Sequence, residues 1–116
     1  MIDLYYWPTP NGHKISIALE EMGLEYQIFP INISQDDQFQ PDFLKISPNN
    51  KIPAIVDQNG PQGQAISIFE SGAILQYLGR KTGLFYPTDE IKRVEVEQWL
   101  MCCFAPTILT SSLCRQ

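Results

Sequence analysis

An acidic and a hydroxyl side chain stand next to each other at Glu70 and Ser71, where a short apolar run gives way to a helical pattern. The first N–H groups of a helix have no partner inside the helix and attract carboxylates. Ser71 could add a hydroxyl donor, and Glu70 could accept from an ammonium group. The pair suits the zwitterionic head of an amino acid, although serine is also an ordinary helix cap.

A second group of polar side chains lies in PTPNGHKI, between a β-rich opening and a helical pattern. There Thr9 and Asn11 would point at a helix N-terminus. A thiolate at that point could accept hydrogen bonds from both and would feel the helix dipole, and both effects lower a thiol pKa. The alternative is a turn that uses these residues for backbone reasons. We expect a solvated His13 rather than a base, and strand packing for Tyr5 and Tyr6, which could also donate to a sulfur.

A proline stands directly before the apolar run Ala54-Ile55-Val56. Pro53 gives a strand no N–H, which is tolerated at the first residue of a strand. The alternative is a cis bond between Ile52 and Pro53, which would leave the backbone of Ile52 free to pair with a ligand. Since only about 5–6% of X–Pro bonds are cis, the residues alone do not decide.

The secondary-structure elements that must position these residues are predicted in the order β-α-β-α, then β-β-α, along the chain. We expect a right-handed crossover between the first two strands, as parallel strands require, and a hairpin between the last two. This order predicts a thioredoxin-like α/β sandwich. The expected strands lie at 2–7, 25–33, 52–57 and 65–69, and the expected helices at 12–22, 41–46 and 70–82.

Two finer expectations concern the edges and faces of these elements. Pro30 indicates that the second strand lies at a sheet edge. In the third helix the spacing of apolar residues predicts that four side chains point inward: Ala73, Ile74, Tyr77 and Leu78.

Composition excludes several function classes. The chain has 116 residues and a formal charge of −5, so it is one domain, or one domain with part of another, and is poorly suited to nucleic acid. It has no apolar run near the ~20 residues that span a membrane. The start Met1-Ile2-Asp3 lacks the basic region of a secretory signal, and so we expect a cytoplasmic protein.

The end of the chain differs from the rest. Pro87 to Glu90 indicates a new helix over about 88–104, which Ala105-Pro106 should stop. All three cysteines lie in the last fifteen residues, and all 13 acidic residues lie at or before Glu97. We therefore expect a truncated or frame-shifted reading, in which residues 102–116 carry no selected structure.

Three motifs together resemble the N-terminal domain of cytosolic glutathione transferases: TPNGHKISIALEEMGLEY, FLKISPNNKIPAIVD and Ile68-Phe69-Glu70-Ser71. The likeness covers about residues 1–101 and is greatest to the bacterial nu class, a group of glutathione-dependent disulfide-bond reductases. It implies a thioredoxin-like glutathione-binding domain at 1–83 and, at 88–104, the first helix of a truncated helical domain. Residues 105–116 would form an irregular tail.

The resemblance also implies where glutathione would bind. Glu70 and Ser71 match the pair that holds the γ-glutamyl amine and carboxylate. Gln38 matches a residue that reaches the glycyl end, and Lys51 lies near enough in the sequence to help neutralise the glycyl carboxylate.

For the cysteinyl part, the resemblance implies a cis bond at Pro53 and backbone pairing by Ile52, as an added strand would pair. Thr9 and Asn11 match positions near the glutathione sulfur. Asn11 is the expected thiol-activating residue, and Tyr6 is not excluded as a contributor.

No cysteine precedes residue 102, so a thiol for disulfide exchange would have to come from bound glutathione, with no metal. The expected partners are glutathione and a small disulfide or electrophile, with a homodimer in the full-length family and no nucleic acid or membrane. Two alternatives stay open. One is conventional conjugation of glutathione to electrophiles, and the other is a non-catalytic thioredoxin-like binding module.

Overall fold

The computed structural model describes residues 1–104, and the tail predicted at 105–116 lies outside the described residues. The chain separates into two compact units, residues 1–75 and the residues from Gln76 onward. The domain boundaries expected at residues 83 and 88 stay predictions.

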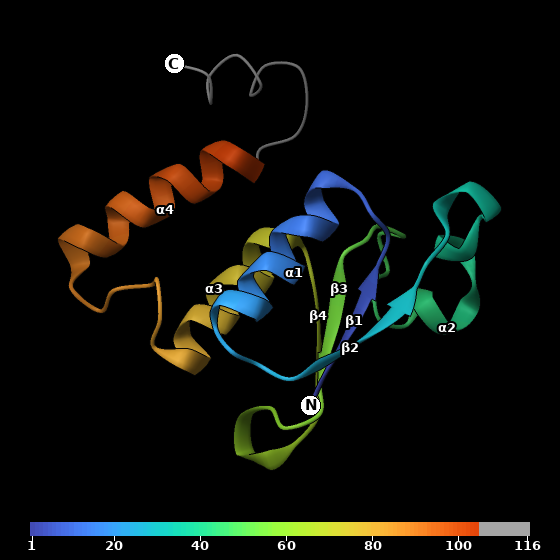
Figure 1. The fold of residues 1–116 in the computed structure, drawn as a ribbon, viewed down its shortest axis with the longest axis horizontal. Coiled ribbons are helices and arrows are strands. Elements are labelled where there is room, and N and C mark those ends of the chain that lie inside the picture. Colours follow the sequence, from blue (N-terminus) through green and yellow to red (C-terminus); the bar gives the residue numbers. More distant parts are fainter. Residues whose placement is uncertain (105–116) are drawn as a thin grey trace. The chain divides into compact units, whose positions relative to one another are not determined.

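The first unit is built on a four-stranded sheet of order β2-β1-β3-β4. Parallel pairing joins β1 to β2, and antiparallel pairing joins β1 to β3 and β3 to β4, so the predicted crossover and hairpin are both present (Figure 1). The edge position expected from Pro30 is confirmed. The bounds of the strands are β1 Ile2–Tyr6, β2 Tyr26–Pro30, β3 Ala54–Asp57 and β4 Ile66–Phe69.

Helices join these strands in the predicted thioredoxin-like order. Figure 1 shows α1 and α2 on opposite sides of the strands. The short α2 ends earlier than the predicted Ile46, because the N–H groups of both Ile46 and Ser47 turn back to the carbonyl of Phe43. The helical elements are α1 Pro10–Glu21, the 3-10 turns Ile33–Gln35 and Asp37–Phe39, α2 Pro41–Leu44, the 3-10 turn Pro61–Gly63, and α3 Ser71–Thr82.

The central strand β1 is buried on both of its faces. Leu4 and Ile55 lie opposite each other in the sheet, and both are fully buried. On the other face Asp3 is only 6% exposed, and its carboxylate accepts from the side-chain amides of Gln27 and Gln58, each at 2.7 Å. These two donors satisfy a carboxylate that would otherwise be buried at a high energetic cost.

The sequence-based assignment of one helical face needs a correction. Ile74 is fully buried as expected, but Ala73 is exposed and Gly72 is buried in its place. Leu78 is also fully buried and Tyr77 is half-buried, so Ala73 alone departs from the predicted face.

In the second unit, polar contacts converge on one carboxylate. Glu97 accepts from the hydroxyl of Tyr86 at 2.7 Å and from the amide of Gln76 at 3.4 Å. The hydrogen bond to Glu97, with a smaller contribution from burial, raises the pKa of Tyr86. The guanidinium of Arg93 lies 4.7 Å from the centre of the Tyr86 ring.

The helix α4 spans Glu90–Phe104. It begins two residues later than the predicted position 88, where Asp89 rather than Thr88 accepts from the N–H of Lys92. Its apolar side chains include Ile91 and Trp99, which are 82% and 62% exposed. No helix in residues 1–104 combines the length and apolarity needed to cross a membrane.

Candidate functional site at the sheet edge

The sheet register brings three separate chain segments together at one end of the strands. This end, where β1 and β4 stop and β3 starts, is the sheet edge that holds the candidate site. Tyr5 near the end of β1 pairs with Ala54 at the start of β3, and Ala54 also pairs with Phe69 at the end of β4. The residues that follow β1, precede β3 and follow β4 therefore meet at the same edge. These residues are the predicted pairs Thr9 and Asn11, Ile52 and Pro53, and Glu70 and Ser71.

The first segment is the start of α1. Thr9 is its N-cap, with extended backbone (φ −126°), and its Oγ1 accepts from the N–H of Gly12 at 3.2 Å. A Cβ on Gly12 would come within 2.4 Å of the carbonyl oxygen of Trp7, so glycine allows the helix to start directly against the end of β1. The Thr9 oxygen is thus occupied as an acceptor, while its O–H can still donate.

Asn11 lies in the first turn of α1 and is exposed. Its Oδ1 accepts from the ammonium of Lys14 at 3.1 Å. The carbonyl end of the amide is therefore turned to a cation, which leaves the NH₂ end as the group that can donate to a ligand.

Tyr6 and His13 form a contact that the sequence did not suggest. The Tyr6 hydroxyl lies 3.0 Å from Nδ1 of His13, and the two rings meet edge to face. His13 is exposed as expected, yet it has this partner. A strand-to-helix contact seven residues apart depends on the angle between the elements, which no local sequence signal gives.

Tyr5 has the packing role expected of it. Its ring stacks on Phe29 with centroids 5.1 Å apart and lies 6.0 Å from the ring of Phe43. Burial, and to a smaller degree the charge of Asp3, raises the pKa of Tyr5, so its hydroxyl stays protonated at neutral pH.

The second segment is the loop before β3. The Ile52–Pro53 peptide bond is cis, as the resemblance implied. Pro53 is buried, and among the described residues no backbone hydrogen bond outside the regular elements uses the N–H or C=O of Ile52. Ser47, which is fully buried, donates to the carbonyl of Lys51 at 2.8 Å and so fixes this loop, while the Lys51 side chain is exposed.

The third segment is the start of α3. Glu70 has a left-handed backbone (φ +72°), and its carbonyl accepts from the N–H of Ile74 at 2.9 Å. Ser71 is the first helical residue, is 7% exposed, and its hydroxyl has no hydrogen-bond partner among residues 1–104. The simple alternative of Ser71 as the cap of α3 is therefore not what the structure shows.

Gln38 lies in the 3-10 turn Asp37–Phe39, which belongs to the connection after β2. Because β2 runs parallel to β1, this connection begins at the same end of the sheet. Its Oε1 is buried and lacks a partner in the described part of the chain. Buried acceptors are normally paired, so this amide has capacity for a donor that the chain itself does not provide.

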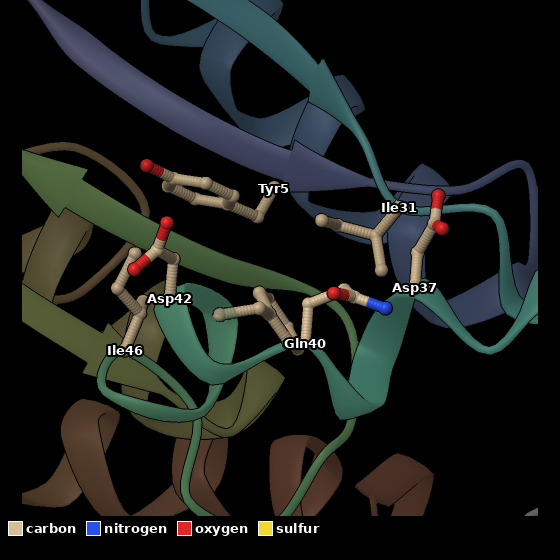
Figure 2. Close-up of a pocket in the computed structure, with 7 residues that line it drawn as sticks. Tyr5, Ile31, Asp37, Gln40, Asp42 and Ile46 are labelled. Atoms are coloured by element: carbon tan, nitrogen blue, oxygen red, sulfur yellow. The ribbon is translucent and has the colours of Figure 1, made fainter.

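A pocket of about 220 Å³ lies in the first unit, between β1 and α2 (Figure 2). None of the predicted site residues lines it. It was not predicted from the sequence, because its lining residues come from three segments that are separated in the chain. Polar and apolar residues alternate among them, so no single segment indicates a pocket. Within residues 1–104 no cluster of three or more His, Cys, Asp or Glu side chains could hold a metal ion.

Comparison with known proteins matches the same part of the chain. Residues 1–80 match the model of the glutathione S-transferase N-terminal domain. The chain is 54% identical over 101 residues to the disulfide-bond oxidoreductase YfcG of Escherichia coli K12, covering 86% of this chain and 47% of that protein. It is 44% identical over 105 residues to the disulfide-bond oxidoreductase YghU of the same organism, covering 85% and 36%.

Solved structures agree with these matches. A glutathione transferase from Pseudomonas putida, with one glutathione disulfide bound per subunit, superposes with a TM-score of 0.84 at 53% identity, covering 86% of this chain and 44% of that one. A glutathione transferase YghU from Streptococcus pneumoniae, complexed with glutathione, gives a TM-score of 0.81 at 43% identity, covering 86% and 40%.

These matches define the family and its extent in this chain. The chain spans less than half the length of each of these four relatives. The chain belongs to the glutathione S-transferase family, and residues 1–80 are its N-terminal domain.

Proposed function

We propose that this chain is the glutathione-binding part of a glutathione-dependent disulfide-bond reductase. The observation that carries the proposal is the sheet edge where the unpartnered Ser71 hydroxyl, the start of α3 and the unpaired backbone of Ile52 meet. Two relatives named disulfide-bond oxidoreductase, and a relative crystallised with glutathione disulfide, agree with this chemistry.

Each end of glutathione has a proposed partner. The Ser71 hydroxyl and the first N–H groups of α3 bind the γ-glutamyl carboxylate, while Glu70 accepts from the γ-glutamyl ammonium. The backbone of Ile52, next to Pro53, pairs with the cysteinyl residue as an added strand. Gln38 and Lys51 serve the glycyl end.

The thiol is the reacting group. Asn11 would donate its NH₂ to the glutathione sulfur, and Thr9 its O–H, which together with the α1 dipole lowers the thiol pKa. The thiolate attacks one sulfur of a disulfide, forms a mixed disulfide and releases one thiolate, which takes up a proton. A second glutathione thiolate then attacks the mixed disulfide, releasing the second thiol and glutathione disulfide. The residues proposed to form the site supply no thiol, since residues 1–101 contain no cysteine.

The chain spans 47% of the first of these relatives, so its own activity is part of the proposal. Conjugation to electrophiles and a non-catalytic binding role are the competing proposals. A cytoplasmic location and a homodimer in the full-length protein are further parts of the proposal.

Two measurements test it. Titration calorimetry with S-methylglutathione measures binding without the thiol, and turnover of hydroxyethyl disulfide with glutathione measures the reaction. We expect binding by the whole chain and turnover that Asn11→Ala lowers at least tenfold. The matched control is Asn49→Ala, which replaces an exposed asparagine outside the proposed site. Binding without turnover would favour the non-catalytic role, and absence of binding would refute the proposal.

A further inference from the structure

The pocket between β1 and α2 belongs wholly to the first unit and borders the proposed glutathione site, since Ile52 packs against the cluster that contains Ile31 and Phe43. Its volume is about 220 Å³, and Tyr5 covers it from β1 (Figure 2). The side chains that line it are Tyr5, Ile31, Asp37, Gln40, Asp42, Phe43 and Ile46. None of its lining residues has a role in the glutathione proposal, so substitutions of these residues test the pocket separately.

The walls of this pocket combine apolar side chains with acidic ends. Ile31 and Phe43 are buried in the cluster against which Ile46 packs. The carboxylates of Asp37 and Asp42 lie toward opposite ends of the pocket (Figure 2). A ligand that fits these walls is mainly aliphatic with a cationic tip.

The surrounding charge has the same sign as these carboxylates. Residues 1–75 contain nine acidic and three basic side chains, so the first unit as a whole attracts cations. Close to the pocket, the ammonium of Lys45 lies 3.9 Å from Asp42, and both side chains extend into solvent. Such an exposed pair is weak, and an incoming cation can replace it.

The size of the pocket narrows the choice of occupant. Sites for free small molecules and cofactors usually enclose about 300–1,000 Å³, and this pocket is smaller. Lysine and arginine side chains place a methylene stem on apolar surface and keep the charged tip at a polar end. The exposed Phe29 stacks on the lining residue Tyr5, and the exposed Ile33 and Phe39 are close in sequence to Ile31 and Gln40, so these three could contact the chain carrying such a side chain.

We propose that this pocket receives a lysine or arginine side chain presented by a protein partner. The stem lies against Ile31, Phe43 and Ile46, and the cation meets Asp42. Asp37 contributes less, because its Oδ2 already accepts from the backbone N–H of Asn32 at 2.9 Å. An apolar pocket with a solvent-exposed carboxylate at its border is the observation that selects this occupant.

The test uses the full chain labelled with ¹⁵N and two capped peptides, Ac-Leu-Gly-Arg-Gly-Leu-NH₂ and the same peptide with citrulline in place of arginine. NMR titration gives the affinity and the amides that shift. We expect shifts at Ile31, Phe43 and Ile46, with the arginine peptide bound about threefold to fivefold more tightly, as for one exposed ion pair. Equal affinity for the citrulline peptide would overturn the proposal.

Variants locate the charge. Asp42→Asn should remove most of the preference for arginine and Asp37→Asn should remove less, while both keep the shape of the side chain. Lys45→Gln should strengthen binding, because it removes the competing ammonium. Asp36→Asn is the matched control, since Asp36 is adjacent but does not line the pocket. An equal loss in Asp36→Asn would show general charge attraction and contradict the proposal.

A third ligand separates a protein partner from a free cation. Butylguanidinium carries the same stem and charge without a peptide. We expect it to bind more weakly than the arginine peptide, since it cannot reach the exposed Phe29, Ile33 and Phe39. If butylguanidinium bound as tightly as the peptide, the pocket would be a small-cation site and the protein partner would be refuted.

Discussion

The helices α1 and α3 begin at the same sheet edge, but their first turns are satisfied in different ways. At α1, the extended Thr9 turns its hydroxyl oxygen to the N–H of Gly12. At α3, Glu70 has a left-handed backbone, and the Ser71 hydroxyl makes no hydrogen bond within the described chain. The start of α1 is closed by the protein itself, whereas the start of α3 retains donors.

This difference separates a folding role from a binding role. A left-handed non-glycine residue costs about 1–2 kcal/mol, and such backbone strain gathers at functional sites. Glu70 carries this strain beside the unpartnered hydroxyl of Ser71. Removing the Thr9 cap or crowding Gly12 at α1 should therefore change stability, whereas removing the Ser71 hydroxyl at α3 should change ligand affinity.

The largest effect on stability is expected for Gly12→Ala. The new methyl group would lie 2.4 Å from the carbonyl oxygen of Trp7 and 3.0 Å from the Tyr6 ring. Overpacking of this kind lowers the free energy of unfolding by about 1–3 kcal/mol. Urea unfolding followed by circular dichroism measures it, with Ile17→Ala on the exposed side of α1 as the control.

Helix propensity makes this prediction easy to refute. Alanine stabilises an unconstrained helical position by about 1 kcal/mol relative to glycine. A variant more stable than the parent would mean that α1 does not start against β1.

The next largest effect is expected for Thr9→Ala. Removal of a helix cap lowers the free energy of unfolding by about 1 kcal/mol. Thr9→Ser keeps the oxygen that accepts from Gly12 and should keep most of the stability in the same urea experiment. If serine and alanine were equally destabilising, packing of the Thr9 methyl group would be the cause, and α1 would no longer count as capped by its own side chain.

A smaller effect is expected toward the other end of α1. The Tyr26 hydroxyl donates to Glu20 at 2.7 Å, and this hydrogen bond is the main cause of the raised pKa of Tyr26. Because the pair is largely exposed, Tyr26→Phe should lower the free energy of unfolding by only about 0.5 kcal/mol at pH 8. Unfolding by urea at several pH values measures the difference.

The sign of the pH dependence follows from the raised pKa. The folded protein holds the Tyr26 proton more tightly than the unfolded chain, whose tyrosine titrates near its ordinary value of 10.0. The contribution is therefore complete below pH 10 and disappears as the pH rises through the folded pKa. Parent and Tyr26→Phe should converge above that pH, and a constant difference would contradict the assignment.

The sequence predicted most of the strands and connections that form this edge, because their signals lie within short stretches of the chain. The strands, the crossover and the hairpin follow from apolar runs separated by Gly- and Pro-containing turns. The cis bond before Pro53 came from family resemblance, because the residues around it allow both isomers. The site residues named from the resemblance stay predictions until a ligand is measured.

The features that were missed depend on tertiary packing. The exposure of Ala73, the pairing of Tyr6 with His13 and the acidic pocket beside α2 are set by helix phase and by the angles between elements. The buried Oε1 of Gln38 is a further case, since a polar residue in a polar segment gives no sign of burial.

The smallest effect on stability, and the most informative, is expected for Ser71→Ala. Its hydroxyl has no partner within residues 1–104, so its removal should change the free energy of unfolding by less than about 0.5 kcal/mol. A hydrogen bond to a carboxylate contributes about 1.5–3 kcal/mol, so glutathione affinity should fall about tenfold or more. Calorimetry provides both numbers, with Ser67→Ala on the exposed part of β4 as the control. A destabilised variant that binds glutathione normally would make Ser71 a structural residue, and α1 and α3 would then begin in equivalent ways.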